Sequence, residues 1–199
     1  LPLGVLRAGD VRFEPALQSK ATLISKMGWG EVVRVNLLFS PDFWRSGLIP
    51  APLAAGEGAG FGFVNAPGLP VPVWWATAAP NPVLTGWAGG TAARHLAGQS
   101  ESEIRTAALR SLAFFLGTTE KAIAARLLDF RFHDWSKDPW TRGAYSYAAA
   151  GAEEGFRKLA APVARTLFFA GEATAAEVGT IHGALASGLR AAREVDRAL

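Results

Sequence analysis

The sequence predicts an α+β fold, and three observations support this prediction. Segments rich in β-branched and aromatic residues, of which 31–39 (EVVRVNLLF) is the clearest, are typical of strands. Segments whose apolar residues recur every three or four positions are typical of helices. The two kinds of segment do not alternate regularly, which argues against repeated βαβ units and favours a mixed sheet accompanied by helices.

Most of the expected strands lie in the first two thirds of the chain. Residues 1–13 are expected to be extended, with a turn at 7–10, and residues 15–27 are expected to form a helix that ends at Gly28. The glycine-rich segment 56–62 is expected to form a turn. The segments expected to be strands or extended are 31–39, 61–65, 71–76, 83–88 and 127–132.

Two later helices have clear boundaries in the sequence. Ser100 and Glu103 have capping-box spacing, and Gly117 is expected to end the helix that they begin. The last helix is expected from about Thr180, after an apolar run at 166–170 that is expected to be a buried strand. A strand, a glycine-containing loop and a helix N-terminus in this order are typical of sites that hold the anionic part of a nucleotide cofactor.

The composition excludes several classes of protein. Half of the 199 residues are hydrophobic and 19% are charged, which predicts a sizeable core rather than a disordered chain. The 20 lysines and arginines are scattered, so the net charge of +3 does not indicate a nucleic-acid partner. We find no apolar run of about 18 residues and no signal-peptide pattern, so we expect a cytoplasmic protein without membrane contact. With no cysteine and three separated histidines, we expect no disulfide, no thiol chemistry and no metal site.

Three motif candidates have little support. The glycines of 56–62 do not have the spacing of the dinucleotide fingerprint, and no helix-forming segment follows them. Ser187 does not lie in a nucleophile-elbow motif. His133 and Asp134 are either an acid–base pair or a hydrogen-bonded structural turn, and the structural interpretation is favoured.

The aromatic segment 135–147 is more informative. Trp135, Trp140 and Tyr145 recur at intervals of five, and Glu172 follows in the later glycine-containing loop. Aromatic side chains stack on flat conjugated rings and attract cationic amines. The alternative is that these residues only fill a core, and the spacing alone does not decide between the two interpretations.

Five stretches resemble the FAD-dependent amine oxidases, the family of the monoamine oxidases, the polyamine oxidases and the flavin-dependent lysine-specific histone demethylases. They follow the family's order over nearly the whole chain: LPLGVLRAGDVRFEPAL, MGWGEVVRVNLLF with FW after it, LTGWAGG, WSKDPWTRGAYSY, and LFFAGEAT with GTIHGALASGLRAA after it. The resemblance implies that residues 1–130 form most of a substrate-binding domain and that residues 131–199 complete a Rossmann-like FAD domain. The family's N-terminal GxGxxG unit is not in this sequence. The resemblance therefore implies that upstream sequence or another chain supplies the ADP-binding half of the FAD site, and that this fragment alone is inactive.

The resemblance also implies roles for individual residues. Trp135 matches the tryptophan that packs beside the flavin ring. Trp140 and Tyr145 match the aromatic wall that faces the substrate amine, and we expect them to act in catalysis. Gly171 and Glu172 match the loop near the ribityl–pyrophosphate part of FAD.

Three departures, at Thr180, Ala144 and Arg7, separate this chain from parts of the family. Thr180 and Ile181 match the helix start that approaches the flavin, and Thr180 replaces a tyrosine of the monoamine oxidases. Ala144 stands where monoamine oxidases carry the cysteine bonded to the flavin, so we expect non-covalent FAD. Arg7 stands where the family usually has a lysine that holds a water at flavin N5. Because arginine is bulkier and keeps its proton, we expect a slower reaction of the reduced flavin with oxygen.

The activity implied by the resemblance is the oxidation of a primary or secondary small-molecule amine to an imine by hydride transfer to FAD. Two alternatives stay open. One is a related amino-acid oxidase or another flavin dehydrogenase, such as a phytoene-type desaturase. An arginine that binds a substrate carboxylate would support the amino-acid oxidase, and Arg7 and Arg34 are weak candidates for it. The other is a truncated domain without catalysis.

Overall fold

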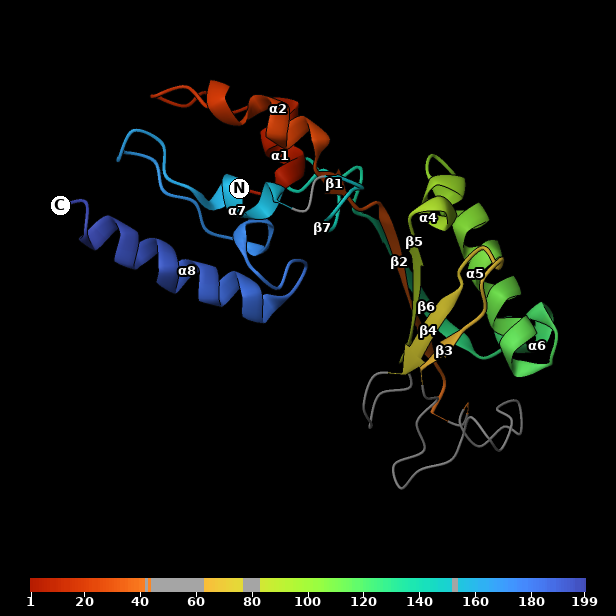
Figure 1. Cartoon of the computed structure of the whole chain (residues 1–199). Helices are drawn as coiled ribbons and strands as arrows, with labels where there is room; N and C mark the ends of the chain where they lie inside the picture. Colours follow the sequence, from red (N-terminus) through yellow and green to blue (C-terminus); the bar gives the residue numbers. More distant parts are fainter. Residues whose placement is uncertain (42, 44–62, 77–82, 152–153) are drawn as a thin grey trace. The chain divides into compact units, whose positions relative to one another are not determined.

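The structure is a computed structural model, and it describes residues 1–41, 43, 63–76, 83–151 and 154–199. Within these residues the chain forms two compact units, each with its own apolar core (Figure 1). Unit 1 joins Leu1–Glu31 to Trp135–Leu199, and unit 2 is the segment Val32–Asp134. This division differs from the expected boundary at residue 130 because the N-terminal segment shares a core with the C-terminal segment.

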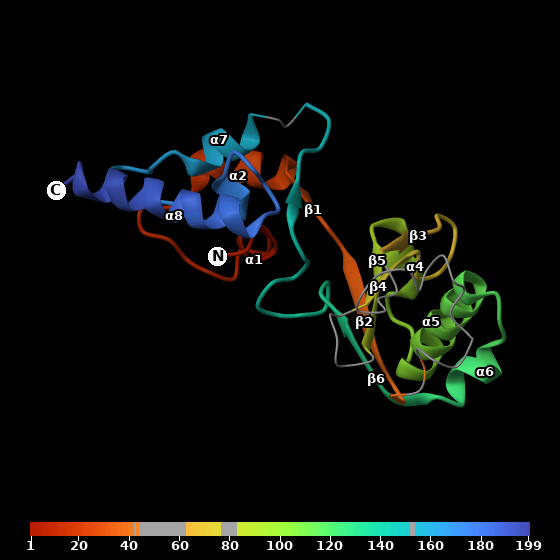
Figure 2. The ribbon, with the colours of Figure 1, turned by 90° about the horizontal axis from the view of Figure 1, so that it is seen from below.

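Unit 2 is a sheet covered on one face by helices (Figures 1 and 2). Its strands are β2 (Val32–Phe39), β3 (Val64–Asn65), β4 (Val73–Ala76), β5 (Val83–Gly89) and β6 (Leu127–Asp134). Its helices are α4 (Thr91–Leu96), α5 (Glu101–Leu116) and α6 (Glu120–Ala124). The strand order is β3-β4-β5-β2-β6. Each segment expected to be extended in this unit contains one of these strands, whereas the expected turn at 56–62 lies outside the described residues.

The sheet of unit 2 is antiparallel in every pair that the structure describes, so the expected mixed sheet is wrong for these residues. Strands β5 and β6 are joined through the three helices and point in the same direction. However, β2 lies between them and is antiparallel to both. The helical connection therefore joins two strands that are not neighbours, and no parallel pair results.

The core of unit 2 lies between the sheet and its helices. Val35 and Leu37 of β2 are buried, whereas Arg34 between Val33 and Val35 is exposed, as a two-residue period requires. Gly86 of β5 allows the core to close, since a Cβ there would lie 2.9 Å from the ring of Trp74. The other face of the sheet carries Arg34 and is called the open face, because none of the described helices of unit 2 covers it.

Helix α5 begins and ends where the sequence predicts. The backbone N–H of Glu103 donates to Ser100 Oγ (3.3 Å), and the backbone N–H of Ser100 donates to Glu103 Oε2 (2.7 Å). Gly117 follows the helix in the left-handed conformation, at φ 61°. The capping box and the C-terminal glycine are therefore confirmed.

Replacing Ser100 with alanine is expected to lower the free energy of unfolding by about 1 kcal/mol at neutral pH. The hydrogen bonds from Ser100 hold the pKa of Glu103 below its usual value of 4.5, so the carboxylate's contribution is lost as pH falls through the folded-state pKa. Urea unfolding at about pH 7 and about pH 3 should therefore show a smaller penalty at acid pH. Ser102→Ala, at the second residue of the same helix, is the control. An equal penalty at both pH values would contradict the prediction.

Unit 1 packs short helices around a small core. Its elements are α1 (Leu3–Ala8), α2 (Gln18–Lys26), β1 (Gly28–Trp29), β7 (Ser146–Tyr147), α7 (Gly155–Ala160), the 3₁₀ helix η2 (Glu172–Thr174) and α8 (Ile181–Asp196). Strands β1 and β7 pair antiparallel. The buried core residues are Leu3, Ile24, Met27, Phe156, Leu159 and Ala173. Leu3 and Ile24 thus meet side chains from more than a hundred positions later in the chain.

Two expectations for unit 1 are wrong. Residues 3–8 are helical rather than extended, because one turn of helix buries Leu3 and Val5. Residues 166–170 do not form a strand, and Leu167 makes only an isolated bridge with Val163. A strand needs a neighbour for its backbone groups, and the described residues supply none beside this segment. Among the helices that the structure describes, none has both the length and the apolar character needed to cross a membrane.

Candidate functional site

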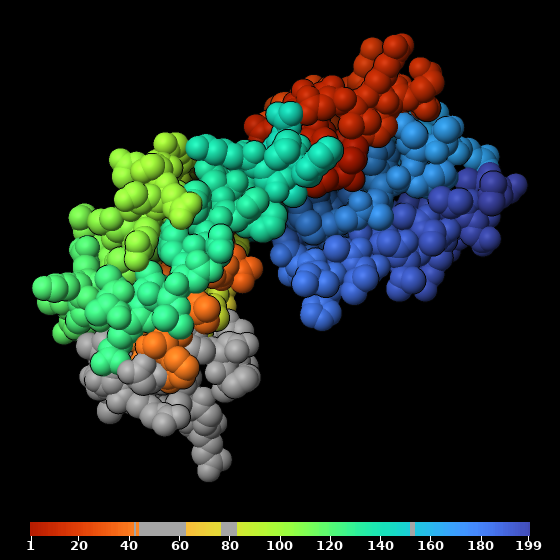
Figure 3. Space-filling view, turned by 180° about the vertical axis from the view of Figure 1, so that it is seen from behind, coloured from red at the N-terminus to blue at the C-terminus, as the bar shows by residue number. Residues whose placement is uncertain are grey.

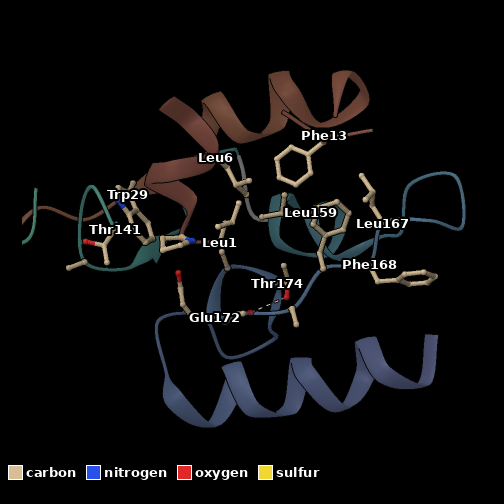
Figure 4. A pocket seen from close by; sticks show the side chains of 16 residues that line it. Leu1, Leu6, Phe13, Trp29, Thr141, Leu159, Leu167, Phe168, Glu172 and Thr174 are labelled. Carbon is tan, nitrogen blue, oxygen red and sulfur yellow. Dashed lines mark hydrogen bonds between the residues drawn. The ribbon is translucent and has the colours of Figure 1, made fainter. Parts of the chain in front are cut away.

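Unit 1 contains a cavity of about 370 Å³ (Figure 4). Leu6 and Phe13 of the N-terminal segment lie on one side of it, and Glu172 and Thr174 of η2 lie on the opposite side. Trp29 of β1 also lines it, and the remaining walls come from residues 141–144, α7 and residues 167–171. The cavity is therefore mostly apolar, with a carboxylate at one edge.

The aromatic segment 135–147 is attached to the N-terminal segment through Trp29. The indole Nε1 of Trp29 donates to the carbonyl oxygen of Arg142 (2.7 Å). Gly4 and Gly143 lie so close to this indole that neither position has room for a Cβ. The guanidinium of Arg142 forms an ion pair with Asp10, just after α1. These contacts hold α1, β1 and the aromatic segment together as one body within unit 1.

Glu172 is half-buried and accepts three hydrogen bonds from other segments of unit 1. Its Oε1 accepts from the backbone N–H of Ser146 (3.2 Å), and its Oε2 accepts from Ser146 Oγ (2.7 Å) and the backbone N–H of Gly179 (2.8 Å). Ser146 is buried. The carboxylate therefore links β7, η2 and the loop before α8.

Side chains of α8 hold the segment that precedes η2. Ser187 Oγ accepts from the backbone N–H of Gly171 (2.8 Å), and Arg190 Nη2 donates to the carbonyl oxygen of Phe169 (2.7 Å). Arg190 also pairs with Glu194 one turn later (2.9 Å). Helix α8 thus supplies the hydrogen bonds that a neighbouring strand would otherwise give to residues 169–171.

A buried lysine forms part of the support behind the cavity. Lys20 of α2 is 4% exposed, and its Nζ donates to the carbonyl oxygens of Lys158 (2.8 Å), Leu159 (3.0 Å) and Ala161 (2.7 Å) at the C-terminal end of α7. It also lies 4.7 Å from the ring centroid of Phe169, which lines the cavity. Burial lowers the pKa of this ammonium group. A positive charge at this place satisfies the carbonyl groups that end a helix.

Helix α8 begins at an exposed N-cap. Thr180 Oγ1 accepts from the backbone N–H of Gly183 (2.9 Å), so the expected helix start is confirmed. Ile181 is 78% exposed, and the first N–H groups of a helix have no acceptor within it. Leu185 and Leu189, which share the face of Ile181, are 66% and 65% exposed. Helix α8 lies on the outside of unit 1 (dark blue in Figure 3).

All nine residues to which the resemblance assigns a role lie in unit 1, but they do not all line the cavity. Ala144, Gly171 and Glu172 line it. Arg7 is exposed in the last turn of α1 and borders a separate groove on unit 1, although its neighbour Leu6 lines the cavity. Trp140 is 81% exposed. The carbonyl oxygen of Trp135 accepts a hydrogen bond from the backbone N–H of Asp138 (3.4 Å), within the same aromatic segment.

Tyr145 connects β1 with the start of α8. Its carbonyl oxygen accepts from the backbone N–H of Gly30 (2.7 Å). A Cβ on Gly179 would lie 3.9 Å from the Tyr145 ring, so this ring lies beside the residue that precedes Thr180. Tyr145 and Thr180 are therefore both tied to Glu172 through their chain neighbours Ser146 and Gly179.

Sequence reasoning missed Trp29, Lys20 and Ser146, which hold the site together. The flanking glycines of Trp29 are a signal for close packing around its ring. Lys20 gives no signal in the sequence, because its three acceptors lie about 140 positions later. His133 and Asp134 are residues of β6 in unit 2, in register with Arg34 and Val33 of β2, so they are strand residues rather than a turn.

Comparison with known proteins identifies the family to which this chain belongs. The family model of flavin containing amine oxidoreductases matches residues 1–196. The chain belongs to this family.

Individual relatives narrow the comparison. The chain is 32% identical to histone demethylase-like protein A of Aspergillus fumigatus over 97% of this chain and 18% of that protein. It is 33% identical to lysine-specific histone demethylase 1 homolog 3 of Arabidopsis thaliana, over 96% of this chain and 12% of that protein. It is 32% identical to polyamine oxidase 4 of Oryza sativa subsp. japonica, over 98% of this chain and 37% of that protein. The chain thus spans 12% to 37% of the length of these relatives.

Two solved structures share the fold. A double mutant of putrescine oxidase superposes with a TM-score of 0.78 at 20% identity, over 99% of this chain and 41% of that one. Cyclohexylamine oxidase from Brevibacterium oxydans superposes with a TM-score of 0.74 at 22% identity, over 99% of this chain and 42% of that one.

Proposed function

We propose that this chain is the C-terminal part of a flavin-dependent oxidase that converts a primary or secondary small-molecule amine to an imine. The observation that carries the proposal is the family match over residues 1–196. It is joined by the fact that all residues to which the resemblance assigns a role lie in unit 1. FAD, when bound, supplies the chemistry as the acceptor of a hydride from the carbon beside the amine nitrogen. The protein's part is to bind and orient the amine and to exclude water.

The residues of unit 1 fit part of a flavin. The cavity offers apolar walls, including the indole of Trp29, for a flat conjugated ring. Gly171 has φ 127° and open space where a Cβ would lie, which allows close approach of a ligand to its backbone. The exposed N-terminus of α8 favours a partly negative ring edge. Ala144 lines the cavity and the chain has no cysteine, so we propose that FAD is held without a covalent bond.

Each remaining residue has a proposed role. Trp135 packs beside the flavin, and Tyr145 and Trp140 position the amine through their rings. The amine reacts in its neutral form, so no strong base is required of the protein. Arg7 is proposed to hold a water near the flavin with less efficiency than a lysine would.

We propose that a second half of the FAD site covers α8. Ile181, Leu185 and Leu189 form an exposed apolar row on the side of α8 that faces away from the unit 1 core. The apolar segment 166–170 also has no strand beside it among the described residues. An apolar helix face beside such a segment fits an α/β partner, and the relatives extend well beyond the matched length. The occupant is therefore the GxGxxG-bearing FAD half.

Unit 2 is proposed to supply most of the substrate-binding domain. Its open sheet face carries the rings of Trp75 and Trp87, with centroids 6.3 Å apart, and Phe63 stacks on Trp75 at the same distance. A row of aromatic rings on a sheet suits the apolar part of an amine.

One observation favours a second candidate function. Arg34 is exposed on the open face and stands directly opposite Trp87 in the β2–β5 pair. An arginine beside an aromatic ring can bind a carboxylate, which would fit an amino-acid oxidase. Replacing Arg34 with methionine would raise KM for amino acids but not for simple amines if this candidate is right.

The 199-residue chain alone should not retain stoichiometric FAD through gel filtration. The chain joined to its FAD half should retain FAD that acid or heat releases, and an amine should bleach the flavin band without oxygen.

Leu185→Glu is expected to prevent assembly of the flavin site without unfolding unit 1. Since Leu185 is exposed, Leu185→Glu should leave the circular dichroism of the chain unchanged while reducing the flavin that the joined protein retains at least about tenfold.

Arg197→Glu, an exposed change of charge at the C-cap of α8 and two turns beyond Leu189, is the control for this variant. Full flavin retention by Leu185→Glu would show that the apolar row is not the docking surface. If the joined protein binds no flavin, or binds flavin that no amine bleaches, the proposed oxidase is wrong and the truncated, non-catalytic domain is favoured.

A further inference from the structure

The open face of unit 2 changes in character from one side of the sheet to the other. Its aromatic half consists of Phe63, Trp75 of β4 and Trp87 of β5, whose neighbouring ring centroids lie 6.3 Å apart. Its basic half contains Arg34 of β2 and Arg131 of β6. The two halves meet where the register places Arg34 directly opposite Trp87. The face therefore presents flat rings and guanidinium groups side by side, at the strand spacing of about 4.8 Å.

The polar groups beneath the rings are satisfied within the sheet. Thr85 of β5 stands opposite Trp75 in register, yet it is only 1% exposed. Its hydroxyl donates to Asn36 Oδ1 (2.9 Å) on the neighbouring strand β2. The aromatic half is therefore an apolar surface, and a ligand that lies on it leaves no buried hydroxyl without a partner.

Arg34 has a guanidinium group that the protein leaves available. It makes no hydrogen bond and no ion pair with any residue that the structure describes. Its neighbours in register are Trp87 and His133, and its diagonal neighbours include Thr85 and Arg131. None of these side chains is a carboxylate, so the sheet itself does not balance the charge of Arg34.

Arg131 differs from Arg34 because its charge is balanced. Its Nε donates to Asp129 Oδ2 (3.0 Å), and the two groups together carry no net charge. Among the described residues of the open face, Arg34 is therefore the arginine without a counter-charge. A single guanidinium fits a monoanion, and it binds a carboxylate through two parallel N–H donors.

We propose that the open face of unit 2 binds a flat ring together with a carboxylate, and that the amine substrate is an aromatic amine with this carboxylate on its ring or on a side chain of the ring. The second part rests on the proposed function, and the first part does not. The ring contacts Trp75 and Trp87, and the carboxylate pairs with Arg34. Because Arg34 belongs to unit 2 and the residues assigned to the flavin belong to unit 1, the carboxylate is placed at the ring rather than on the carbon that gives up the hydride.

The first experiment measures binding to the 199-residue chain without flavin, with the indole N–H resonances of Trp75 and Trp87 as probes. Phenylacetate, whose carboxylate lies about one strand spacing from the ring centre, should bind at least about tenfold more tightly than its neutral analogue phenylacetamide. Since Arg34 is exposed, Arg34→Met should leave the circular dichroism unchanged and remove this preference, whereas Arg34→Lys should retain part of it. Arg105→Met, a change at an exposed arginine of α5, is the control and should alter neither affinity.

Trp87→Leu tests the ring part of the site. It should weaken the binding of phenylacetate and phenylacetamide by a similar factor of about ten, and it should leave the preference for the acid in place. Equal affinities of the wild-type chain for the acid and the amide would overturn the proposal. A preference that survives in Arg34→Met, or affinities that do not change in Trp87→Leu, would overturn it as well.

The second experiment uses the flavin-loaded protein joined to its FAD half. The KM for 4-(aminomethyl)phenylacetate should be at least about tenfold lower than the KM for 4-(aminomethyl)phenylacetamide, and Arg34→Met should raise the KM for the acid alone. Equal KM values for the two amines would overturn the substrate assignment. A joined protein that oxidises neither amine contradicts the proposed oxidase and the substrate assignment with it, whereas the site for a ring and a carboxylate is tested by the first experiment alone.

Discussion

Gly143→Ala is expected to lower the free energy of unfolding of unit 1 by about 3 kcal/mol. Gly143 has φ 142°, which residues with a Cβ rarely adopt, and its Cβ would overlap the indole of Trp29. The indole has little freedom to move aside, because Gly4 packs against it and its Nε1 donates to Arg142. The variant should therefore detach the aromatic segment from the N-terminal segment and open the cavity that Trp29 and Ala144 line.

Variants at two other glycines separate backbone strain from overlap with Trp29 as causes of this loss of stability. Gly9→Ala has a positive φ of 72° but open space around the new methyl group, so it should cost about 1 kcal/mol from backbone strain alone. Gly188→Ala, inside α8 with nothing near the new methyl group, should stabilise by about 0.5 kcal/mol. Urea unfolding of the three variants, with the indole N–H resonance of Trp29 as a local probe, gives the comparison. A Gly143→Ala penalty no larger than that of Gly9→Ala would show that Trp29 is not tightly held.

Local features of the fold could be predicted because a few neighbouring residues determine them. The capping box of α5 depends on Ser100 and Glu103, which are three positions apart, and Gly117 ends that helix without help from distant residues. Strand β2 could be predicted because β-branched residues and alternation agree along it. Helix α8 has a threonine cap and a clear apolar row.

The remaining features depend on contacts between distant parts of the chain. The six residues of α1 are too few to indicate a helix by themselves, and their stability comes from burying Val5 and from burying Leu3 in the unit 1 core. The apolar run 166–170 has the composition of a buried strand, but α8 rather than a sheet satisfies the backbone around it. Composition therefore predicts that a segment needs a partner, and it does not say which partner.

The candidate site, like the fold, could be predicted from the sequence only in part. The resemblance selects residues that all lie in unit 1, although Arg7 and Glu172 are far apart in sequence. It does not identify what holds them, because the hydrogen bonds of Trp29 and Lys20 cross more than a hundred positions. The role of Glu172 as a link between β7 and α8 likewise needs the acceptor geometry, which no motif contains.

Lys20→Met is expected to destabilise unit 1 by about 3 kcal/mol, because three carbonyl groups at the end of α7, one buried and two partly buried, lose their donor. Methionine fills a similar volume, so loss of packing contributes little. The contact between the ammonium group and the Phe169 ring is also lost, which loosens a wall of the cavity. Hydrogen exchange in α7 should become faster together with the fall in unfolding free energy. Lys26→Met, an exposed lysine of the same helix, should change the free energy by less than about 0.5 kcal/mol.

The effect of Lys20→Met should also depend on pH. Burial lowers the pKa of Lys20, so near its usual value of 10.5 the unfolded chain binds this proton more tightly than the folded chain does. The wild-type chain should therefore gain stability relative to Lys20→Met as pH rises toward 10.5, and lose that gain as pH falls through the folded-state pKa. The test is to measure the unfolding free energies of the wild-type chain and of Lys20→Met from neutral pH upward and to compare their difference at each pH. A difference that narrows over this range would mean that the folded chain binds the proton more tightly, and that the three carbonyl groups outweigh burial at this lysine.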